Sequence, residues 1–146
     1  MTHRAETIMQ AVVTTLTGLA TTSTRVSRGR AYPIAVDDDN ALAIFQGPDE
    51  ISEDSMFHRV WSKLTVNIEA VARESTAQID ETLNAIRKEV AGAIGADTNL
   101  GLAFEIGSLE LAAEQPEVTD EGDRPMGRMR IVLGINYMRD RADPAN

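Results

Sequence analysis

The stretch HRVWSKLTVNIEAVAR, residues 58–73, decides the fold because its apolar side chains recur at every second position. The even-numbered positions from Val60 to Ala72 are apolar except Ser62, whereas most of the odd-numbered positions are polar. A period of two predicts a strand that buries one face and leaves the other facing solvent. We therefore expect a long, half-buried strand here.

The segment after this strand has the period of a helix. Ser75 and Gln78 have the spacing of a capping box, in which each side chain satisfies a free backbone donor at a helix start. Gly95 is predicted to end the helix in a left-handed conformation. The apolar residues between them fall at steps of four, three, four and four, which gives one stripe along a helix of about five turns: Ile79, Leu83, Ile86, Val90 and Ile94.

Upstream, apolar spacing predicts a helix over Arg4–Leu16, with Thr2 or His3 near its start and Gly18 near its end. Two short strands are expected over residues 25–30 and 32–36. A return strand over residues 41–46 would close a hairpin across the acidic turn 37–40.

Two acidic segments are predicted to be long loops. Gln46–Phe57 includes a Gly-Pro pair, and its apolar residues Ile51 and Met56 either fold back on the core or are offered to a partner. Glu114–Met126 is the second such segment. Long loops in compact domains are often functional.

Between and after these loops, we expect a strand over Leu102–Leu111 with a bulge near Gly107. The last strand is predicted over Gly127–Arg139, followed by a flexible charged tail over residues 140–146. This order of elements predicts an α+β domain that spans residues 1–146, with a mainly antiparallel sheet and two helices packed on one face.

The composition excludes several classes of function. The formal net charge of −9 argues against a nucleic-acid backbone as the main ligand. The chain has no cysteine, which excludes disulfides and thiolate catalysis and fits a reducing cytoplasm. No apolar run approaches the roughly 18 residues of a membrane span, so we expect no membrane partner.

The charge is unevenly distributed along the chain. Residues 1–36 hold four Arg and one Glu, whereas residues 37–57 hold seven acids and no Lys or Arg. Such an arrangement suits self-association through complementary patches. It also suits solvated loops that keep the protein soluble, and on charge alone this second interpretation is favoured.

The sequence contains no recognisable catalytic or metal-binding set. Its two histidines, His3 and His58, lie in unrelated settings, and no glycine pattern forms a phosphate-binding loop. Glu69 and Glu105 could act as an acid/base pair, but 23 acids make such a pairing uninformative. The acidic turn at residues 37–39 lacks the glycine and distal glutamate of a calcium loop. We predict no enzymatic activity, no metal and no cofactor.

Several residues are candidates for protein–protein contacts instead. The basic cluster of Arg25, Arg28 and Arg30 could contact phosphates, although a solvated or subunit-pairing edge is favoured. Trp61 lies on the outward parity of its strand, so it is either covered by another element or part of an interface. The remaining candidates come from the two acidic segments and the last strand: Asp49, Glu50, Glu53, Asp54, Glu117, Asp120, Glu121, Asp123, Arg128 and Arg130.

The second face of the sheet is not uniformly polar. Val71, Val132 and Met138 fall on its outward parity, and the chain has too few helices to cover two faces. An apolar surface without a covering layer suggests oligomerisation.

Taken in this order, the chain resembles the tail terminator proteins of long-tailed bacteriophages, the lambda-type minor tail protein U group. The resemblance extends over most of the 146 residues in layout and hydrophobic pattern. It is carried by the N-terminal helix followed by Arg25-Val-Ser-Arg28, by Tyr32-Pro-Ile-Ala-Val36, by the strand Trp61–Val71, by the helix Ile79–Ile94 leading into Leu102-Ala-Phe104, and by the final strand Arg128–Tyr137.

The resemblance implies a structural virion protein without enzymatic activity, assembled in the host cytoplasm. Members of such families form rings, expected to be hexamers, at the head-proximal end of the tail. Their implied partners are other copies of the chain, the tail tube protein on one side and the head–tail connector protein on the other. DNA would pass through the lumen without specific binding, and the acidic segments 49–54 or 117–123 are hypothesised to line it.

Three other functions stay open at this level. The first is a different connector or completion protein of the head–tail junction. The second is an acidic protein that mimics DNA and binds a basic partner, and the third is a small hydrolase that uses carboxylates.

Overall fold

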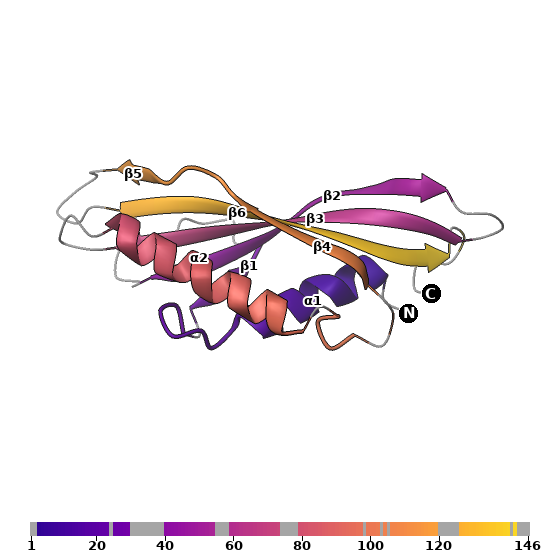
Figure 1. The fold of residues 1–146 in the computed structure, drawn as a ribbon, viewed down its shortest axis with the longest axis horizontal. Coiled ribbons are helices and arrows are strands. Elements are labelled where there is room, and N and C mark those ends of the chain that lie inside the picture. Colours follow the sequence, from indigo (N-terminus) through magenta and orange to yellow (C-terminus); the bar gives the residue numbers. More distant parts are fainter. Residues whose placement is uncertain are drawn as a thin grey trace.

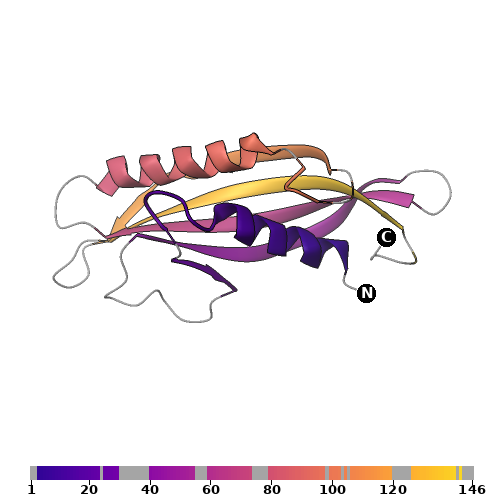
Figure 2. The same cartoon turned by 90° about the horizontal axis from the view of Figure 1, so that it is seen from below.

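The fold is one sheet with two helices on the same face. The computed structural model describes residues 3–23, 25–29, 40–54, 59–73, 79–97, 99–102, 104, 106–119, 126–140 and 142. In chain order its elements are α1 (Arg4–Leu16), β1 (Val26–Arg28), β2 (Ala41–Asp54), β3 (Arg59–Arg73), α2 (Ile79–Ala96), β4 (Ile106–Ala113), β5 (Glu117–Thr119) and β6 (Met126–Asp140). Figures 1 and 2 show α1 and α2 side by side beneath the twisted sheet. The predicted α+β class, with both helices on one face, is confirmed.

The strands follow the order β1-β2-β3-β6-β4, and β5 also pairs with β6. β1 lies parallel to β2 over three residues, and every other pairing is antiparallel. β3 and β6 pair along their whole lengths, from Arg59 opposite Asp140 to Arg73 opposite Met126. These two central strands form the backbone of the sheet.

β3 confirms the strand predicted from the period of two. All of its even-numbered side chains from Val60 to Ala72 are buried, including the one polar member, Ser62. The alternate positions of β6 that face the same side are buried as well: Met129, Ile131, Leu133, Ile135 and Tyr137. Because these side chains lie on the helix side of the sheet, the core sits between the sheet and the two helices.

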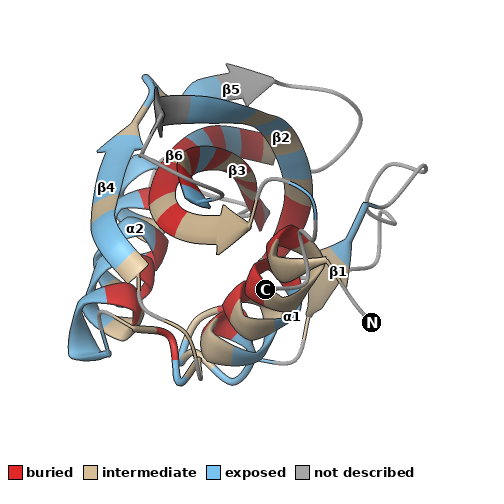
Figure 3. Cartoon of the chain, turned by 90° about the vertical axis from the view of Figure 1, so that its right-hand side faces the viewer, coloured by how far each residue is buried: buried red, intermediate tan, exposed pale blue. Residues whose placement is uncertain are grey.

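Both helices lie where the sequence predicts them, and each buries its apolar stripe. α1 covers the predicted range Arg4–Leu16, and the Nδ1 atom of His3 accepts a hydrogen bond of 2.9 Å from the backbone N–H of Ala5. Gly18 follows α1 with a φ of 95°, a conformation that favours glycine. Figure 3 shows the buried residues of both helices on the sides that face the sheet. No described helix is long and apolar enough to span a membrane.

The predicted end of α2 is wrong by a small margin. Gly95 is still helical and does not have a positive φ; the helix continues to Ala96. The left-handed residues come later, at Leu100 with a φ of 54° and Gly101 with a φ of 67°. The helix therefore ends one residue later than the predicted stop at Gly95. The capping pair Ser75 and Gln78 lies outside the described residues.

The first predicted acidic loop is wrong, because most of it is strand. β2 runs from Ala41 through Gly47 and Pro48 to Asp54, instead of ending at Gln46. Two register shifts against β3, between Gln46 and Asp49 and between Ile51 and Glu53, absorb the extra residues. Pro48, which has no backbone N–H to donate, lies within the first of these shifts, where the regular pairing with β3 is interrupted.

The second acidic loop is also partly strand. Residues Glu117–Thr119 form β5, which pairs with Met126–Arg128 of β6. β4 begins at Ile106 rather than Leu102, because residues 99–102 form a turn that the side chain of Asn99 ties to the backbone of Ile106. The predicted bulge at Gly107 is confirmed by a register shift between Ile106 and Ser108.

Other predictions fall outside the described residues. These are the strand over 32–36, the turn at 37–39, the apolar residues Met56 and Phe57, Glu105, and the tail beyond Asp140 apart from residue 142.

Candidate assembly surface

The face of the sheet that carries no helix, called the open face below, consists of the odd-numbered side chains of β3 and the even-numbered side chains of β6, extended by Glu110 and Ala112 of β4. Polar groups dominate this face. Val71 is nevertheless buried, and Val132 and Met138 are half-buried, so the predicted apolar patches on this face are present but small.

Charged side chains cross the open face in pairs. The ammonium group of Lys63 on β3 lies 3.2 Å from the carboxylate of Glu110 on β4, although β6 runs between these strands. This contact is possible because residue 134 of β6 is glycine: a Cβ atom there would lie 3.0 Å from the Cε atom of Lys63. Further along, Arg128 lies 3.4 Å from Glu69. Exposed pairs of this kind add little to the stability of the fold. They do set the pattern of charges on the open face.

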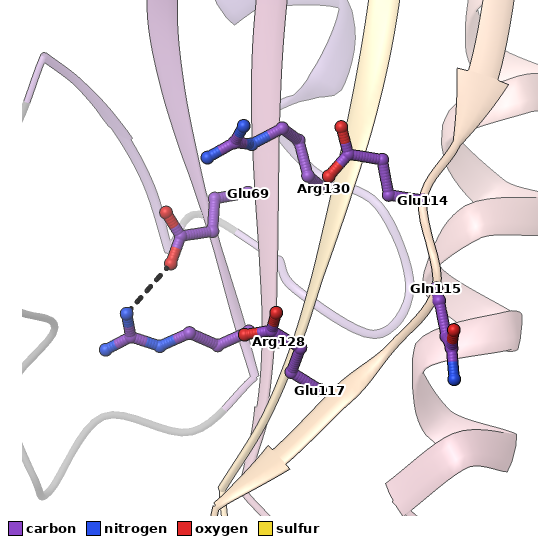
Figure 4. A pocket seen from close by; sticks show the side chains of 6 residues that line it. All are labelled: Glu69, Glu114, Gln115, Glu117, Arg128 and Arg130. Atoms are coloured by element: carbon purple, nitrogen blue, oxygen red, sulfur yellow. Dashed lines mark ion pairs between the residues drawn. The ribbon is translucent and has the colours of Figure 1, made fainter.

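At one end of the open face the surface forms a hollow of about 280 Å³. Figure 4 shows that β3, the segment after β4, β5 and β6 all contribute side chains to it. Arg128 is paired with Glu69. Among the described residues, Arg130, Glu114 and Glu117 have no ion partner within the chain. The lining residues are Glu69, Glu114, Gln115, Glu117, Arg128 and Arg130.

This hollow brings together three predicted candidates, Glu117, Arg128 and Arg130. Carboxylates outnumber guanidinium groups, three to two, so the hollow does not suit a phosphate group. Within the described part of the chain, no group of three or more histidine or acidic residues could hold a metal ion. Alternating charges on a shallow surface suit a second protein surface of complementary pattern.

Trp61 is partly covered by another element, as the first of the two alternatives predicts. Its ring lies over Gly107 of β4, where a Cβ atom would come within 2.6 Å of Cζ3. The side chain is half-buried as a result. The bulge at Gly107 thus provides the space that the indole ring fills.

Two members of the basic cluster, Arg25 and Arg28, make contacts inside the chain. Arg25 donates to the backbone oxygens of Asn40, at 2.8 Å, and Thr21, at 3.1 Å. Arg28 forms a two-pronged ion pair with Glu6 of α1, in which Arg28 holds the pKa of the Glu6 carboxyl below its usual value. These contacts tie β1 to its flanking elements. Arg30 lies outside the described residues.

The acidic candidates have different fates. Asp49 turns to the helix side of the sheet, where it accepts a hydrogen bond of 2.7 Å from the hydroxyl of Tyr137. Glu50 is exposed on β2. Glu53 and Asp54 lie in the same strand. Asp120, Glu121 and Asp123 are not among the described residues.

Sequence reasoning missed a polar cluster at the end of the sheet near α1. Arg4 lies over the ring of Phe104, 4.6 Å from its centroid, and donates to the backbone oxygen of Met138. Burial lowers the pKa of Arg4, and the nearby Arg59 lowers it further. Burial and then the Asp49 carboxylate raise the pKa of Tyr137 far above its ordinary value.

Comparisons with known proteins bear on the fold. No family model matches the sequence, and no curated protein matches it. Among solved structures, the fold is similar to a chain of the virion of a native gene transfer agent particle, with a TM-score of 0.55 and 18% sequence identity. The match covers 92% of this chain and 87% of that chain. At this level of identity, the likeness shows that the two chains share a fold over nearly their whole lengths.

Proposed function

We propose that this chain is a structural virion protein of a long-tailed phage or phage-like particle, and that it acts by binding alone. The observation that carries the proposal is the fold shared with a virion chain from end to end. A partial match would be compatible with a common supersecondary motif on an unrelated protein. The match covers 92% of this chain and 87% of that chain, so it concerns nearly the whole fold and not a single motif.

The surface chemistry supports a binding role. The open face carries ion pairs that cross from strand to strand and a hollow of unpaired charges of both signs, which are features of protein–protein contact surfaces. The buried polar groups at the α1 end are used in hydrogen bonds that join strands. The described hollow is lined by three carboxylates, two guanidinium groups and one amide.

In its finer form, the proposal is that the protein terminates the tail. A ring of about six copies, as the resemblance to tail terminator proteins implies, would cap the last ring of the tail tube, stop tube polymerisation and present its other side to the head–tail connector. DNA would pass through the lumen without specific binding. The protein would reside at the head-proximal end of the tail after assembly in the host cytoplasm.

The charge of the chain agrees with a DNA-conducting lumen, since like charge keeps DNA from adhering to the wall. Asp49 cannot contribute freely, because its carboxylate is engaged with Tyr137. Glu114 and Glu117 are exposed, and they are the better candidates for a wall position. Changing both to Gln should still allow rings to form, which the mass in solution checks, and should slow DNA ejection; unchanged ejection by variant rings would exclude a lumen role for these residues.

The proposed function is tested by the mass of the protein in solution over a dilution series, with negative-stain images of the same fractions. Rings of about six subunits that block elongation of tail tube protein would support the terminator role. Rings of about twelve would indicate a connector instead. A monomer at every concentration that also fails to bind tubes would overturn the proposal, and competition with DNA for a basic partner would then be tested.

A further inference from the structure

The described residues include only two large apolar side chains that are well exposed. Ile51 is 51% exposed and Leu111 is 37% exposed. Ile51 lies on β2 and Leu111 lies on β4, the two long strands at opposite margins of the sheet. Isolated exposed apolar residues are common. Their placement on the two margins of one sheet calls for an explanation.

Both side chains point to the same side of the sheet. Ile51 is opposite Ser62, and Leu111 is opposite Leu133, and both partners belong to the buried, helix-facing set. The hydrogen bond from Tyr137 to Asp49 confirms this orientation for β2, because residues 49 and 51 share one face. In Figures 1 and 2 the far end of β2 extends beyond α1, so this helix does not cover it, in agreement with the 51% exposure of Ile51.

The backbone of β4 offers free hydrogen-bonding groups at Leu111. The N–H of Glu114 donates to the oxygen of Arg130 on β6, over 2.8 Å. In an antiparallel ladder, successive residues point their N–H and C=O groups alternately to either side. Glu110 and Ala112 therefore share the orientation of Glu114, and Leu111 directs its backbone groups away from β6, toward the open margin.

The same reasoning applies to β2. The N–H of Leu42 donates to the oxygen of Arg25, so Leu42 directs its backbone groups away from β3. Leu42 is opposite Ala70, and Ile51 is opposite Ser62. Ala70 and Ser62 are both even-numbered residues of β3, so their backbone groups point to the same side. The backbone groups of Ile51 therefore also point to the outer margin, where no described residue pairs with them.

The strand directions suit a contact between these two margins. The four long strands β2, β3, β6 and β4 alternate in direction, so β2 and β4 at the two margins run antiparallel to each other. When a second copy is placed beside the first by rotation, its β2 is therefore antiparallel to β4 of the first. Such a head-to-tail contact repeats and can close into a ring.

The offset between the two residues agrees with closure. Within one copy Ile51 is level with Tyr137 of β6, and Leu111 is level with Leu133, four residues away along β6. Matching Ile51 to the Leu111 position shifts each copy by about 14 Å along the strands, against about 19 Å across four strands. These lengths correspond to a strand tilt of about 35°, within the range of closed sheets.

We infer that neighbouring copies of this chain meet edge to edge, with β4 of one copy antiparallel to residues 49–51 of β2 in the next, and Leu111 beside the neighbour's Ile51. The inference deepens the proposed function, because it rests on ring formation and names the contact that builds the ring. The two margins match in side, direction, free backbone positions and apolar side chain, which makes a second copy the fitting occupant.

The contact is short by construction. The register shifts of β2 before Asp49, at Gly47 and Pro48, and after Ile51 limit the regular strand at both ends. Proline and bulges blunt a strand margin against indiscriminate pairing. A three-residue ladder with one apolar pair would bind weakly, so copies would pair only where they are concentrated, for instance on the end of a tube.

The experiment uses the full-length chain, which has no native cysteine. Ile51→Cys and Leu111→Cys variants are mixed and oxidised, and the products are separated without reduction. Directly opposite residues on neighbouring strands have a Cα separation of about 5.5 Å, which permits a disulfide. The control pair is Leu111→Cys with Asn84→Cys, an exposed position on α2. Reaction of all three thiols with Ellman's reagent shows that each is accessible.

We expect the 51–111 heterodimer to exceed the control pair by about tenfold or more, because a bound neighbour raises the effective thiol concentration. The double variant Ile51→Cys/Leu111→Cys should give a covalent ladder that ends at the ring size. Wild-type rings without preferential 51–111 cross-linking would overturn this inference and leave the proposed function standing. Heterodimers without rings would support the contact and contradict the ring. Absence of both would overturn both.

Discussion

The hydroxyl of Tyr137 on β6 donates a 2.7 Å hydrogen bond to the Oδ2 atom of Asp49 on β2, across the intervening strand β3. Tyr137 is fully buried and Ser62, which lies between them on β3, accepts a hydrogen bond from Arg139. The bond therefore fixes a marginal strand to the centre of the sheet. It does so two residues from Ile51, so it also holds the proposed contact edge in place.

Tyr137→Phe should destabilise the protein by about 1.5 to 3 kcal/mol, because it leaves a half-buried carboxylate without its donor. The Oδ1 atom of Asp49 is already buried without a hydrogen-bond partner, so the carboxylate has little compensation. The ring itself is kept, including its tilted contact with Phe104 at 6.5 Å. Urea unfolding followed by circular dichroism measures the change.

The matched control is Ser108→Ala, which removes an exposed hydrogen bond from Asn136 at 2.8 Å. We expect a change below about 0.5 kcal/mol there. Equal effects of the two substitutions would mean that the bond between Tyr137 and Asp49 contributes no more than a surface contact.

The same tyrosine predicts a loss of stability in alkali. Its pKa is raised in the folded protein by burial first and by Asp49 second. The unfolded chain releases the phenol proton near the ordinary value, about pH 10. The tyrosine's contribution is thus fully present below that pH and is lost as the pH rises toward the raised folded value. Urea midpoints between about pH 8 and pH 11 should fall less steeply for Tyr137→Phe than for the wild type.

Gly107→Ala should cost about 1 to 3 kcal/mol, the usual penalty for overfilling a packed site. The new methyl group would lie 2.6 Å from Cζ3 and 3.0 Å from Cη2 of Trp61. The chain has a single tryptophan, so its fluorescence spectrum reports the displacement directly. Gly92→Ala is the control: no heavy atom lies within 4 Å of its added Cβ on α2, and it should stabilise by about 0.5 to 1 kcal/mol. An unchanged spectrum in Gly107→Ala would contradict the packing of Trp61 on β4.

Gly127→Ala should be destabilising for a different reason, since its methyl group would lie 2.1 Å from Cγ2 of Ile79 and 3.0 Å from Cδ1 of Leu83. The start of α2 would have to move off β6. Adding Ile79→Ala removes the closest atom, so the double variant should be more stable than the sum of the single effects by at least about 0.5 kcal/mol. Additive effects in a double-mutant cycle would show that the helix and strand do not meet at this point.

Salt should strengthen assembly if copies meet as proposed. In that register Glu50 lies opposite Ala112 of the neighbour, with the neighbour's Glu110 and Glu114 on the diagonals, where like charges repel. Raising the ionic strength from 0.01 M to 0.15 M shortens the screening length from about 30 Å to about 8 Å. Sedimentation velocity at the two salt concentrations measures the effect. Dissociation on adding salt would favour the complementary-patch alternative.

The central part of the fold is predictable from the sequence because each element carries one unbroken period. The alternation through β3 and the stripe from Ile79 to Ile94 both survive in the structure, as do the limits of α1. Each repeat of a periodic pattern indicates which face of the element is buried, so a long pattern gives many consistent indications.

The margins of the sheet are less predictable. Gly47, Pro48 and the acids around them have the composition of a loop, and only the register shifts against β3 show how a strand accommodates them. The contact of Asp49 with Tyr137 joins residues 88 positions apart, and the hollow at Glu117 and Arg128 depends on β5 folding back on β6. Such relations follow from strand order, which no local pattern encodes.

The place of β6 in the sheet has a consequence for synthesis. β6 lies between β3 and β4 and pairs along the full length of β3, although some fifty residues separate the two strands. A nascent chain that has not yet passed residue 126 can form α1, α2 and the β2–β3 hairpin, but neither ladder of β6. Pairing of distant strands is slow compared with helix and hairpin formation. We therefore expect the order of synthesis to delay assembly. The two margins that we expect to bind neighbours belong to one sheet only after the last strand has emerged from the ribosome.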